Sequence, residues 1–201
     1  KRQIIKYTGS GTSGDRVAHG LGSTPEFFIV KNTGDGDEAF MTYHKNLTTP
    51  AEDFLSLNTT GAEGTATWAW NDESPNSNTI VVSNNDATNG SSDTMIAWVW
   101  KGIQGFSKFG SYVGNGNADG PFIYTGFRPA MVITKKSNST GNWNINDNKR
   151  AGYNPDNNEL YPNRSDAEGT SDYMDFLSNG FKIRSTNTDL SLIHISEPTR
   201  P

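Results

Sequence analysis

One pattern of residues occurs twice along this chain, about 105 residues apart, and it constrains the fold more than any other feature. Each occurrence reads Tyr-x-Gly-x-Gly, a short segment, Gly, Pro, four mostly apolar residues and Lys. The first runs from Tyr7 to Lys31 and the second from Tyr112 to Lys135. A repeat of this length is too long for a solenoid unit and has the size of a domain. The pattern therefore predicts two tandem copies of one domain.

The domain boundaries follow from this repeat. We expect a first domain over residues 1–104 and a second over 105–189, joined at the Gly-rich stretch 101–111. The second copy has no counterpart of the apolar segment 94–100, so we expect it to be incomplete. A sandwich that lacks a core strand exposes an apolar cleft and an unpaired edge, and should be less stable than the complete copy.

The elements of each copy read as short β-strands. Asn, Ser, Thr and Gly together make up 83 of the 201 residues, and all four are mediocre or poor helix formers. Apolar or alternating segments lie between clusters of turn residues, at residues 4–8, 27–31, 53–58, 65–70, 94–100 and 181–184. The predicted fold class is all-β, with two tandem antiparallel β-sandwiches of jelly-roll or lectin-like type, the second truncated.

Charge and composition exclude several classes of protein. The net charge is −5, which argues against sequence-independent binding to nucleic acid. No apolar run is long enough to predict a membrane-spanning helix. The chain has no Cys, so disulfides and thiolate metal sites are excluded.

Two motifs that can indicate a cofactor or a metal are better explained as structural. Gly9 to Gly14 matches GxGxxG, but the Gly and Pro residues that follow leave no room for the helix that a dinucleotide site requires. We expect a hairpin turn there. His19 and His44 are 25 residues apart and lack the close spacing of a metal site, so we expect buried structural side chains. The sequence predicts no cofactor, no metal and no catalytic residue.

A glycan-hydrolysing activity remains an alternative. It needs two carboxyl groups about 5 to 10 Å apart across a cleft. The chain has 22 acidic residues, including the neighbours Glu52/Asp53, Asp72/Glu73, Asp166/Glu168 and Asp172/Asp175. With so many acids some pair meets that spacing by chance, so no pair is assigned.

Trp68 and Trp70 are the candidate ligand-binding residues. If residues 65–70 form a strand, both indoles lie on one face and could stack against a sugar. The same alternation also fills the core of a small sandwich, and core packing is the favoured interpretation. Exposure of both side chains side by side would favour the glycan interpretation.

The carboxyl end differs from the rest of the chain. Leu190 to Pro201 contains neither Asn nor Gly and reads LSLIHISEPTRP. This segment resembles the translation of a transposase adaptor used in shotgun sequencing libraries. We therefore expect residues 190–201 to be an artefact that takes no part in the fold.

The segment 105–130, GFSKFGSYVGNGNADGPFIYTGFRPA, is the most distinctive part of the sequence. Together with His19-Gly20-Leu21-Gly22 and the run 175–182, it resembles an uncharacterised repeat domain of tail-fibre-like and structural proteins of tailed bacteriophages. The resemblance covers roughly residues 4–189 and supplies no catalytic residues, because the family is a domain of unknown function.

That resemblance implies a location and a set of partners. We expect a virion tail or extracellular location, contact with other virion proteins and possible contact with host-surface glycans. A homo-oligomer is compatible with the sequence, which shows no trimer interface. The first functional hypothesis is a non-enzymatic structural or adhesive module of a phage tail fibre. The alternatives are a lectin-like glycan hydrolase domain and a secreted carbohydrate-binding module.

Overall fold

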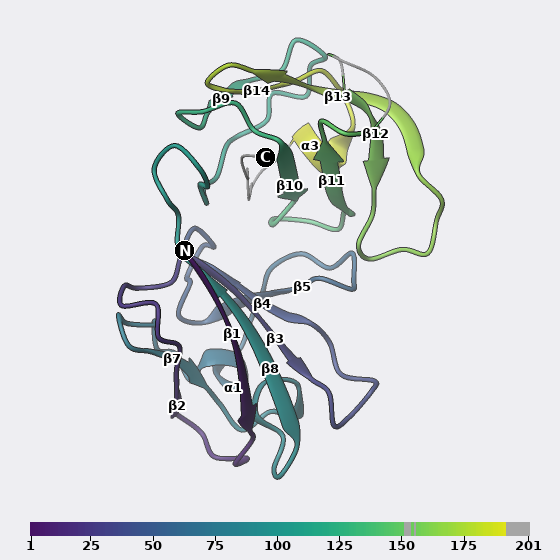
Figure 1. Cartoon of the computed structure of the whole chain (residues 1–201). Coiled ribbons are helices and arrows are strands. Elements are labelled where there is room, and N and C mark those ends of the chain that lie inside the picture. Colours follow the sequence, from purple (N-terminus) through teal and green to yellow (C-terminus); the bar gives the residue numbers. More distant parts are fainter. Residues whose placement is uncertain (151–153, 155, 192–201) are drawn as a thin grey trace. The chain divides into compact units, whose positions relative to one another are not determined.

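The computed structural model describes residues 1–150, 154 and 156–191 (Figure 1). The chain divides into two compact units, which are residues 1–58 with 63–101, and residues 59–62 with those from 102 onward. The division after Lys101 falls three residues before the boundary expected from the sequence. The described part of the chain is built from antiparallel strands with three helical turns of four residues each, so the all-β fold class is confirmed.

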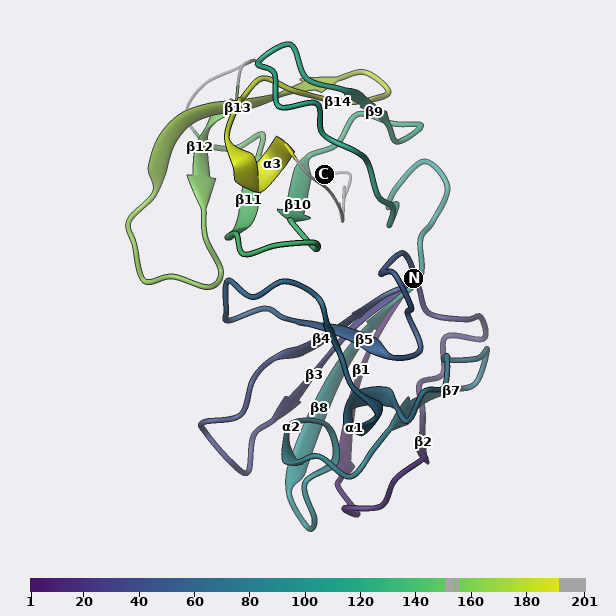
Figure 2. The same cartoon turned by 180° about the vertical axis from the view of Figure 1, so that it is seen from behind.

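Unit 1 contains a six-stranded antiparallel sheet in the order β1-β8-β3-β4-β5-β6. Its strands are β1 (Arg2–Thr8), β3 (Phe27–Asn32), β4 (Met41–His44), β5 (Asp53–Ser56), β6 (Gly64–Thr65) and β8 (Thr94–Trp100). The strand β8 lies between β1 and β3 and pairs with both over most of its length (Figures 1 and 2). Because β8 alternates between buried and half-buried residues, its apolar composition is explained by a central position in the sheet.

A second layer covers one face of this sheet. It consists of the pair β2 (Asp15–Ala18) and β7 (Thr79–Val82) and of the helical turns α1 (Thr67–Trp70) and α2 (Asp86–Asn89). The core between the layers contains Phe28 and Val30 from β3, Met95 from β8, Ile80 from β7 and Trp70 from α1. Burial of these large side chains is the main favourable contribution to folding of unit 1.

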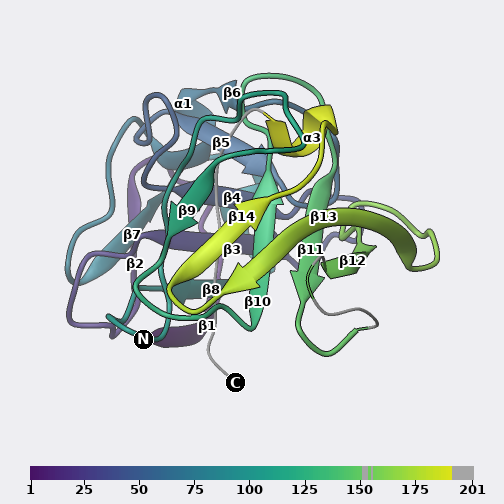
Figure 3. The ribbon, with the colours of Figure 1, turned by 90° about the horizontal axis from the view of Figure 1, so that it is seen from above.

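Unit 2 contains a six-stranded antiparallel sheet in the order β10-β11-β12-β13-β14-β9. Its strands are β9 (Phe122–Tyr124), β10 (Met131–Lys135), β11 (Trp143–Asp147), β12 (Asp156–Leu160), β13 (Gly169–Leu177) and β14 (Gly180–Ile183), followed by the helical turn α3 (Thr188–Ser191). The long strand β13 is curved, β14 lies beside it, and β9 lies beside β14 (Figure 3). This end of the sheet lies across β10 and β11 in both Figures 1 and 3, so one sheet supplies both layers.

The core of unit 2 lies between these two parts of the sheet. It contains Val132 from β10, Met174 and Phe176 from β13, Phe181 from β14 and Leu190 from α3. The expectation that residues 190–201 take no part in the fold is wrong for Leu190, because its side chain is fully buried in this core. Residues 192–201 lie outside the described residues.

Most of the predicted strands form, but two local expectations are wrong. Residues 65–70 were expected to be one alternating strand, whereas β6 ends at Thr65 and α1 begins at Thr67. The segment Gly9 to Gly14 was expected to be a hairpin turn. It connects β1, which pairs with β8, to β2, which pairs with β7, so the strands on its two sides do not pair with each other.

Candidate functional site

The structure does not bring Trp68 and Trp70 onto one face. Both lie in the single helical turn α1, where residues two positions apart point in different directions. Trp70 is 1% exposed, and its indole Nε1 donates a hydrogen bond to the backbone oxygen of Asp53, 2.9 Å away. Trp68 is 37% exposed and packs on Phe54, with ring centroids 4.8 Å apart. The two indoles therefore form no shared stacking surface, and a ligand-binding role for them stays a prediction.

The backbone after α1 explains why the strand expectation fails. Asn71 has a φ of 56° and donates its backbone N–H to Thr67 O, which closes the turn, and Asp72 also has a positive φ. Two consecutive residues in the left-handed region cannot continue an extended strand, and Asn and Asp tolerate that region better than most residues. The period of two in residues 65–70 is too short to distinguish a strand from one turn of helix.

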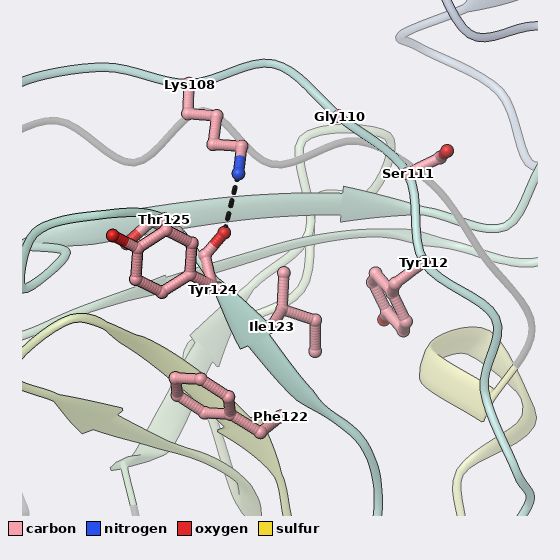
Figure 4. A pocket seen from close by; sticks show the side chains of 8 residues that line it. All are labelled: Lys108, Gly110, Ser111, Tyr112, Phe122, Ile123, Tyr124 and Thr125. Atoms are coloured by element: carbon pink, nitrogen blue, oxygen red, sulfur yellow. Dashed lines mark hydrogen bonds between the residues drawn. The ribbon is translucent and has the colours of Figure 1, made fainter. Parts of the chain in front are cut away.

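A concave site with exposed aromatic side chains lies beside β9 in unit 2. It has a volume of about 240 Å³ and is lined by residues from 108–112 and 122–125 (Figure 4). Phe122 and Tyr124 are 44% and 60% exposed, and between them Ile123 is turned toward the core. Because side chains alternate along a strand, the two rings lie on the same face of β9. Figure 4 shows Ile123 and Tyr112 on the opposite side of the strand from these rings.

Lys108 connects the segment before β9 to the end of this strand through a hydrogen bond. Its Nζ donates a hydrogen bond to the backbone oxygen of Tyr124, 2.7 Å away, and lies 5.4 Å from the centre of the Tyr124 ring. The ammonium group is attracted to the face of that ring by a cation–π interaction. The same contact places a hydrogen-bond donor beside an exposed aromatic face, which is the combination that a polar ligand with an apolar face requires.

A second cation lies at the other end of β9. Lys182 pairs with Phe122 across the β14·β9 ladder, and its Nζ donates to Gly120 O, 2.7 Å away. It also lies 2.8 Å from Asp119 Oδ1. The hydrogen bond and charge of Lys182 lower the pKa of the Asp119 carboxyl, which therefore stays ionised at neutral pH. Both ends of the aromatic strand thus carry charged groups.

Tyr112 forms the inner wall of the site. Its Oη donates to Leu190 O, 2.9 Å away, and its ring packs edge-on against Phe181. Burial raises the pKa of its phenol, so the hydroxyl keeps its proton at neutral pH and remains a donor. Contacts with α3 and β14 therefore hold this wall of the site in place.

The two candidate histidines have structural surroundings. His19 is buried; its Nε2 lies 3.0 Å from Asn76 O, and its Nδ1 accepts a hydrogen bond from Leu21 N. His44 is buried on β4, and its Nδ1 accepts from Asn46 N. Among the described residues, no group of three or more His, Cys, Asp or Glu side chains is arranged to hold a metal ion.

Five of the eight carboxylates noted in the sequence hold neighbouring groups in place. Asp53 is buried and accepts from Thr65 Oγ1, 2.6 Å away, and from Thr49 N. Glu73, Asp166, Glu168 and Asp175 each form an ion pair with an arginine, and these partners are Arg16, Arg164, Arg150 and Arg184 respectively. Each of these five carboxylates therefore has a structural partner.

Sequence reasoning missed the exposed rings of β9. The run Pro121-Phe122-Ile123-Tyr124-Thr125 contains the signal, because aromatic residues alternate with an aliphatic one directly after a Pro. In the sequence analysis this run contributes only to the family resemblance. The alternation of exposed, half-buried and exposed residues in β9 shows that its aromatic face points away from the core.

A family model matches residues 2–192 of the chain, which is almost its full length. The chain belongs to the family described as Domain of unknown function (DUF7483). No curated protein matches this DUF7483 chain, and no solved structure does. Within the part of the chain that the structure describes, no helix is long and apolar enough to cross a membrane.

Proposed function

We propose that this DUF7483 chain is a non-enzymatic structural and adhesive module of a phage tail fibre or a related virion surface protein, built from two related β-sandwich repeats. Its aromatic site beside β9 contacts glycans on the host surface. The single observation that carries the proposed contact is the pair of exposed rings, Phe122 and Tyr124, on one face of a strand at the end of its sheet.

Matching hydrogen bonds support the duplication. Tyr7 Oη donates to the carbonyl of Thr88, the third residue of α2, and Tyr112 Oη donates to the carbonyl of Leu190, the third residue of α3. Both tyrosines begin the repeated Tyr-x-Gly-x-Gly pattern. The side chain of Asn85 accepts from the backbone N–H two residues later, and the side chain of Asn187 does the same.

The strand connections also correspond. In unit 1, β3, β4 and β5 pair in sequence order, and β2 pairs with the later strand β7. In unit 2, β10, β11 and β12 pair in sequence order, and β9 pairs with the later strand β14. These shared features support an origin of both units from one repeated domain.

The chemistry of the site supports a sugar as its ligand. An aromatic face packs against the C–H face of a sugar ring, while hydroxyl groups need nearby donors and acceptors. The site supplies the rings of Phe122 and Tyr124, with Lys108, Ser111 and Thr125 in its lining. A site of about 240 Å³ with rings this exposed predicts weak binding, which many copies on one virion would strengthen through multivalency.

The proposal is tested by a glycan screen and a cell-surface binding assay with the full chain. We expect Tyr124→Ala and Phe122→Ala each to weaken binding at least about tenfold, which corresponds to the loss of one stacked ring. Tyr124→Phe should keep most of the binding because it keeps the ring.

Phe106→Ala is the matched control, because Phe106 is also an exposed aromatic residue of unit 2 and does not line the site. It should leave binding unchanged. A ligand that binds the Tyr124→Ala and Phe122→Ala variants as tightly as it binds the wild type would exclude this site. If the screen finds no ligand, the adhesive role is excluded and only the architectural role remains.

A further inference from the structure

A patch of buried polar side chains crosses three neighbouring strands of unit 2, β10, β11 and β12. Thr134 on β10, Asn144 and Asn146 on β11 and Glu159 on β12 are each at most 2% exposed. Thr134 pairs with Asn144, and Glu159 pairs with Asn146, so the four side chains lie on one face of the sheet. Asn146 pairs on its other side with Val132, which belongs to the core of unit 2. The patch therefore faces this core.

Three of these residues have apolar counterparts in unit 1. The repeated pattern aligns β10 with β3, and the ladder of each strand with the next one aligns β11 with β4. Thr134, Asn144 and Asn146 then correspond, in that order, to Val30, Met41 and Tyr43. These three residues of unit 1 are buried members of its hydrophobic core. Unit 2 thus carries polar groups at positions where the same fold normally buries apolar ones.

Glu159 also replaces an apolar residue, which is Phe54. Phe54 pairs with Gly64 and packs against the core of unit 1, and Glu159 pairs with Gly169. In both pairs the side chain occupies space that the glycine leaves, because a Cβ atom added to the glycine would overlap it. Unit 2 therefore has a buried carboxylate where unit 1 has a phenyl ring.

The oxygen atoms of the patch lack partners within the described part of the chain. Thr134 Oγ1, Asn144 Oδ1 and Asn146 Oδ1 are buried and have no hydrogen-bond partner there. The Nδ2 atoms of the two amides do have one, since Asn144 donates to Asn142 O and Asn146 donates to Asn158 O. These bonds fix the orientation of each amide, so the atoms left without a partner are the acceptors.

The Glu159 carboxylate is surrounded by neutral groups. It accepts from Tyr161 Oη, 2.9 Å away, and from Ser171 N, 3.1 Å away. Among the described residues, Glu159 takes part in no ion pair. Buried carboxylates in proteins are normally paired with a cation or bind a metal, because an isolated buried charge is costly.

A cation accounts for both features of the patch. Water could donate to the two amide oxygens, but it would not compensate the charge of a buried carboxylate. A cation is attracted to the carboxylate and to the amide oxygens together. Carboxylate, amide and water oxygens, without nitrogen or sulfur, are the ligands that Ca²⁺ prefers in proteins.

We propose that the polar patch of Thr134, Asn144, Asn146 and Glu159 binds a hard divalent cation of the Ca²⁺ class. The amide oxygens of Asn144 and Asn146 and the carboxylate of Glu159 are its protein ligands, and water bonded to the Thr134 hydroxyl helps to complete its coordination. Only one of these ligands is charged, so the dissociation constant should be about 0.1–1 mM. The bound ion links β11 to β12 and stabilises unit 2. This site does not depend on glycan binding at β9.

Titration of the full chain with CaCl₂ tests the site. The protein is first treated with a chelator, and binding is then followed by calorimetry and by the midpoint of thermal unfolding. We expect saturable binding of Ca²⁺ and a midpoint that rises with its concentration. NaCl and KCl at equal ionic strength should not produce this rise. No saturable binding of Ca²⁺, or an equal rise with NaCl or KCl, would overturn the proposal.

Two substitutions change the charge of the site in opposite directions. Glu159→Gln removes the charged ligand with little change in size and should weaken Ca²⁺ binding at least about tenfold. Asn144→Asp adds a charged ligand of the same shape and should tighten Ca²⁺ binding at least about tenfold. A gain in affinity cannot result from a failure to fold, so the second variant keeps the test decisive.

Asp147→Asn is the matched control. Asp147 follows Asn146 on β11, so its side chain lies on the opposite face of the strand, where it pairs with Arg150. The substitution removes a carboxylate from the same strand and should leave the affinity for Ca²⁺ unchanged. Equal affinities of the wild type, Glu159→Gln and Asn144→Asp would contradict the assignment, as would a loss in Asp147→Asn as large as that in Glu159→Gln.

Discussion

The phenol oxygen of Tyr112 lies 2.9 Å from the backbone oxygen of Leu190 and donates a hydrogen bond to it. This bond joins the start of the second repeated pattern to the helical turn α3, and Leu190 itself lies in the core of unit 2. The hydrogen bond therefore fixes the side of the site beside β9 that Tyr112 forms. Tyr112→Phe should destabilise unit 2 by about 1–2 kcal/mol, because a half-buried carbonyl loses its partner while the ring keeps its packing. Urea denaturation measures the change.

Tyr7→Phe provides the parallel test in unit 1. Tyr7 Oη donates to Thr88 O, 2.5 Å away, so the loss should be of similar size. If the two units share one architecture, both variants destabilise. A loss in one unit and no change in the other would show that the two hydrogen bonds are not equivalent.

The two candidate tryptophans should differ sharply on substitution. Trp70→Ala removes a fully buried indole and its hydrogen bond to Asp53, which should cost about 3–5 kcal/mol. Trp68→Ala removes a partly exposed ring that packs on Phe54, which should cost about 1 kcal/mol. Thermal unfolding of the two variants checks this order. Equal losses would contradict the helical turn α1, because a strand would place both indoles in the same environment.

The lowered pKa of Lys135 predicts that the stability of the protein depends on pH in the alkaline range. Burial lowers the pKa of its ammonium group to about 8, with Lys136 adding to the effect and Asp189 opposing it. The unfolded chain, with the ordinary pKa near 10.5, then binds more protons than the folded chain between these values. The free energy of unfolding should therefore rise with pH above about 8, by up to about 1.4 kcal/mol per pH unit.

Urea titrations of the wild type between pH 7.5 and 9.5 measure this rise. Lys135→Met should remove it, because the variant has no group at this position that titrates. A rise of the same size in both proteins would assign the effect to another residue.

Gly9 has a steric role that a small substitution reveals. A Cβ atom at Gly9 would lie 2.0 Å from the backbone oxygen of Gly90, so Gly9→Ala forces the connection after β1 away from the segment after α2. The expected loss is about 2 kcal/mol or more. Gly36→Ala is the control, since no atom lies within 4 Å of its added Cβ. It should change stability by less than about 0.5 kcal/mol. Chemical denaturation of both variants compares them, and a neutral Gly9→Ala would contradict the close approach.

The strands were predictable where apolar residues alternate between clear turn signals. The segments 27–31 and 94–100 are recovered as β3 and β8, and the opposed faces of residues 181–184 appear in β14, where Phe181 and Ile183 are buried. These segments are predictable because local pattern and burial agree in them.

The failures have a different cause. In residues 65–70 the alternation is too short, and the positive φ of Asn71 and Asp72 closes a helical turn instead. For Gly9 to Gly14 the local turn chemistry is right but the partners of β1 and β2 are distant in sequence, so pairing could not be read from the turn. The aromatic face of β9 was missed because only the fold reveals which side of a strand faces away from the core.

Native-state amide hydrogen exchange of the full chain tests most directly the claim that β10 corresponds to β3 in the repeated pattern but has one neighbouring strand, β11, among the described residues. The account predicts alternating protection in β10, with slow exchange at Val132 and Thr134 and exchange at Met131 and Ile133 at least about tenfold faster than at Phe27 and Ile29 of β3. Equal protection at Met131, Ile133, Phe27 and Ile29 would contradict it.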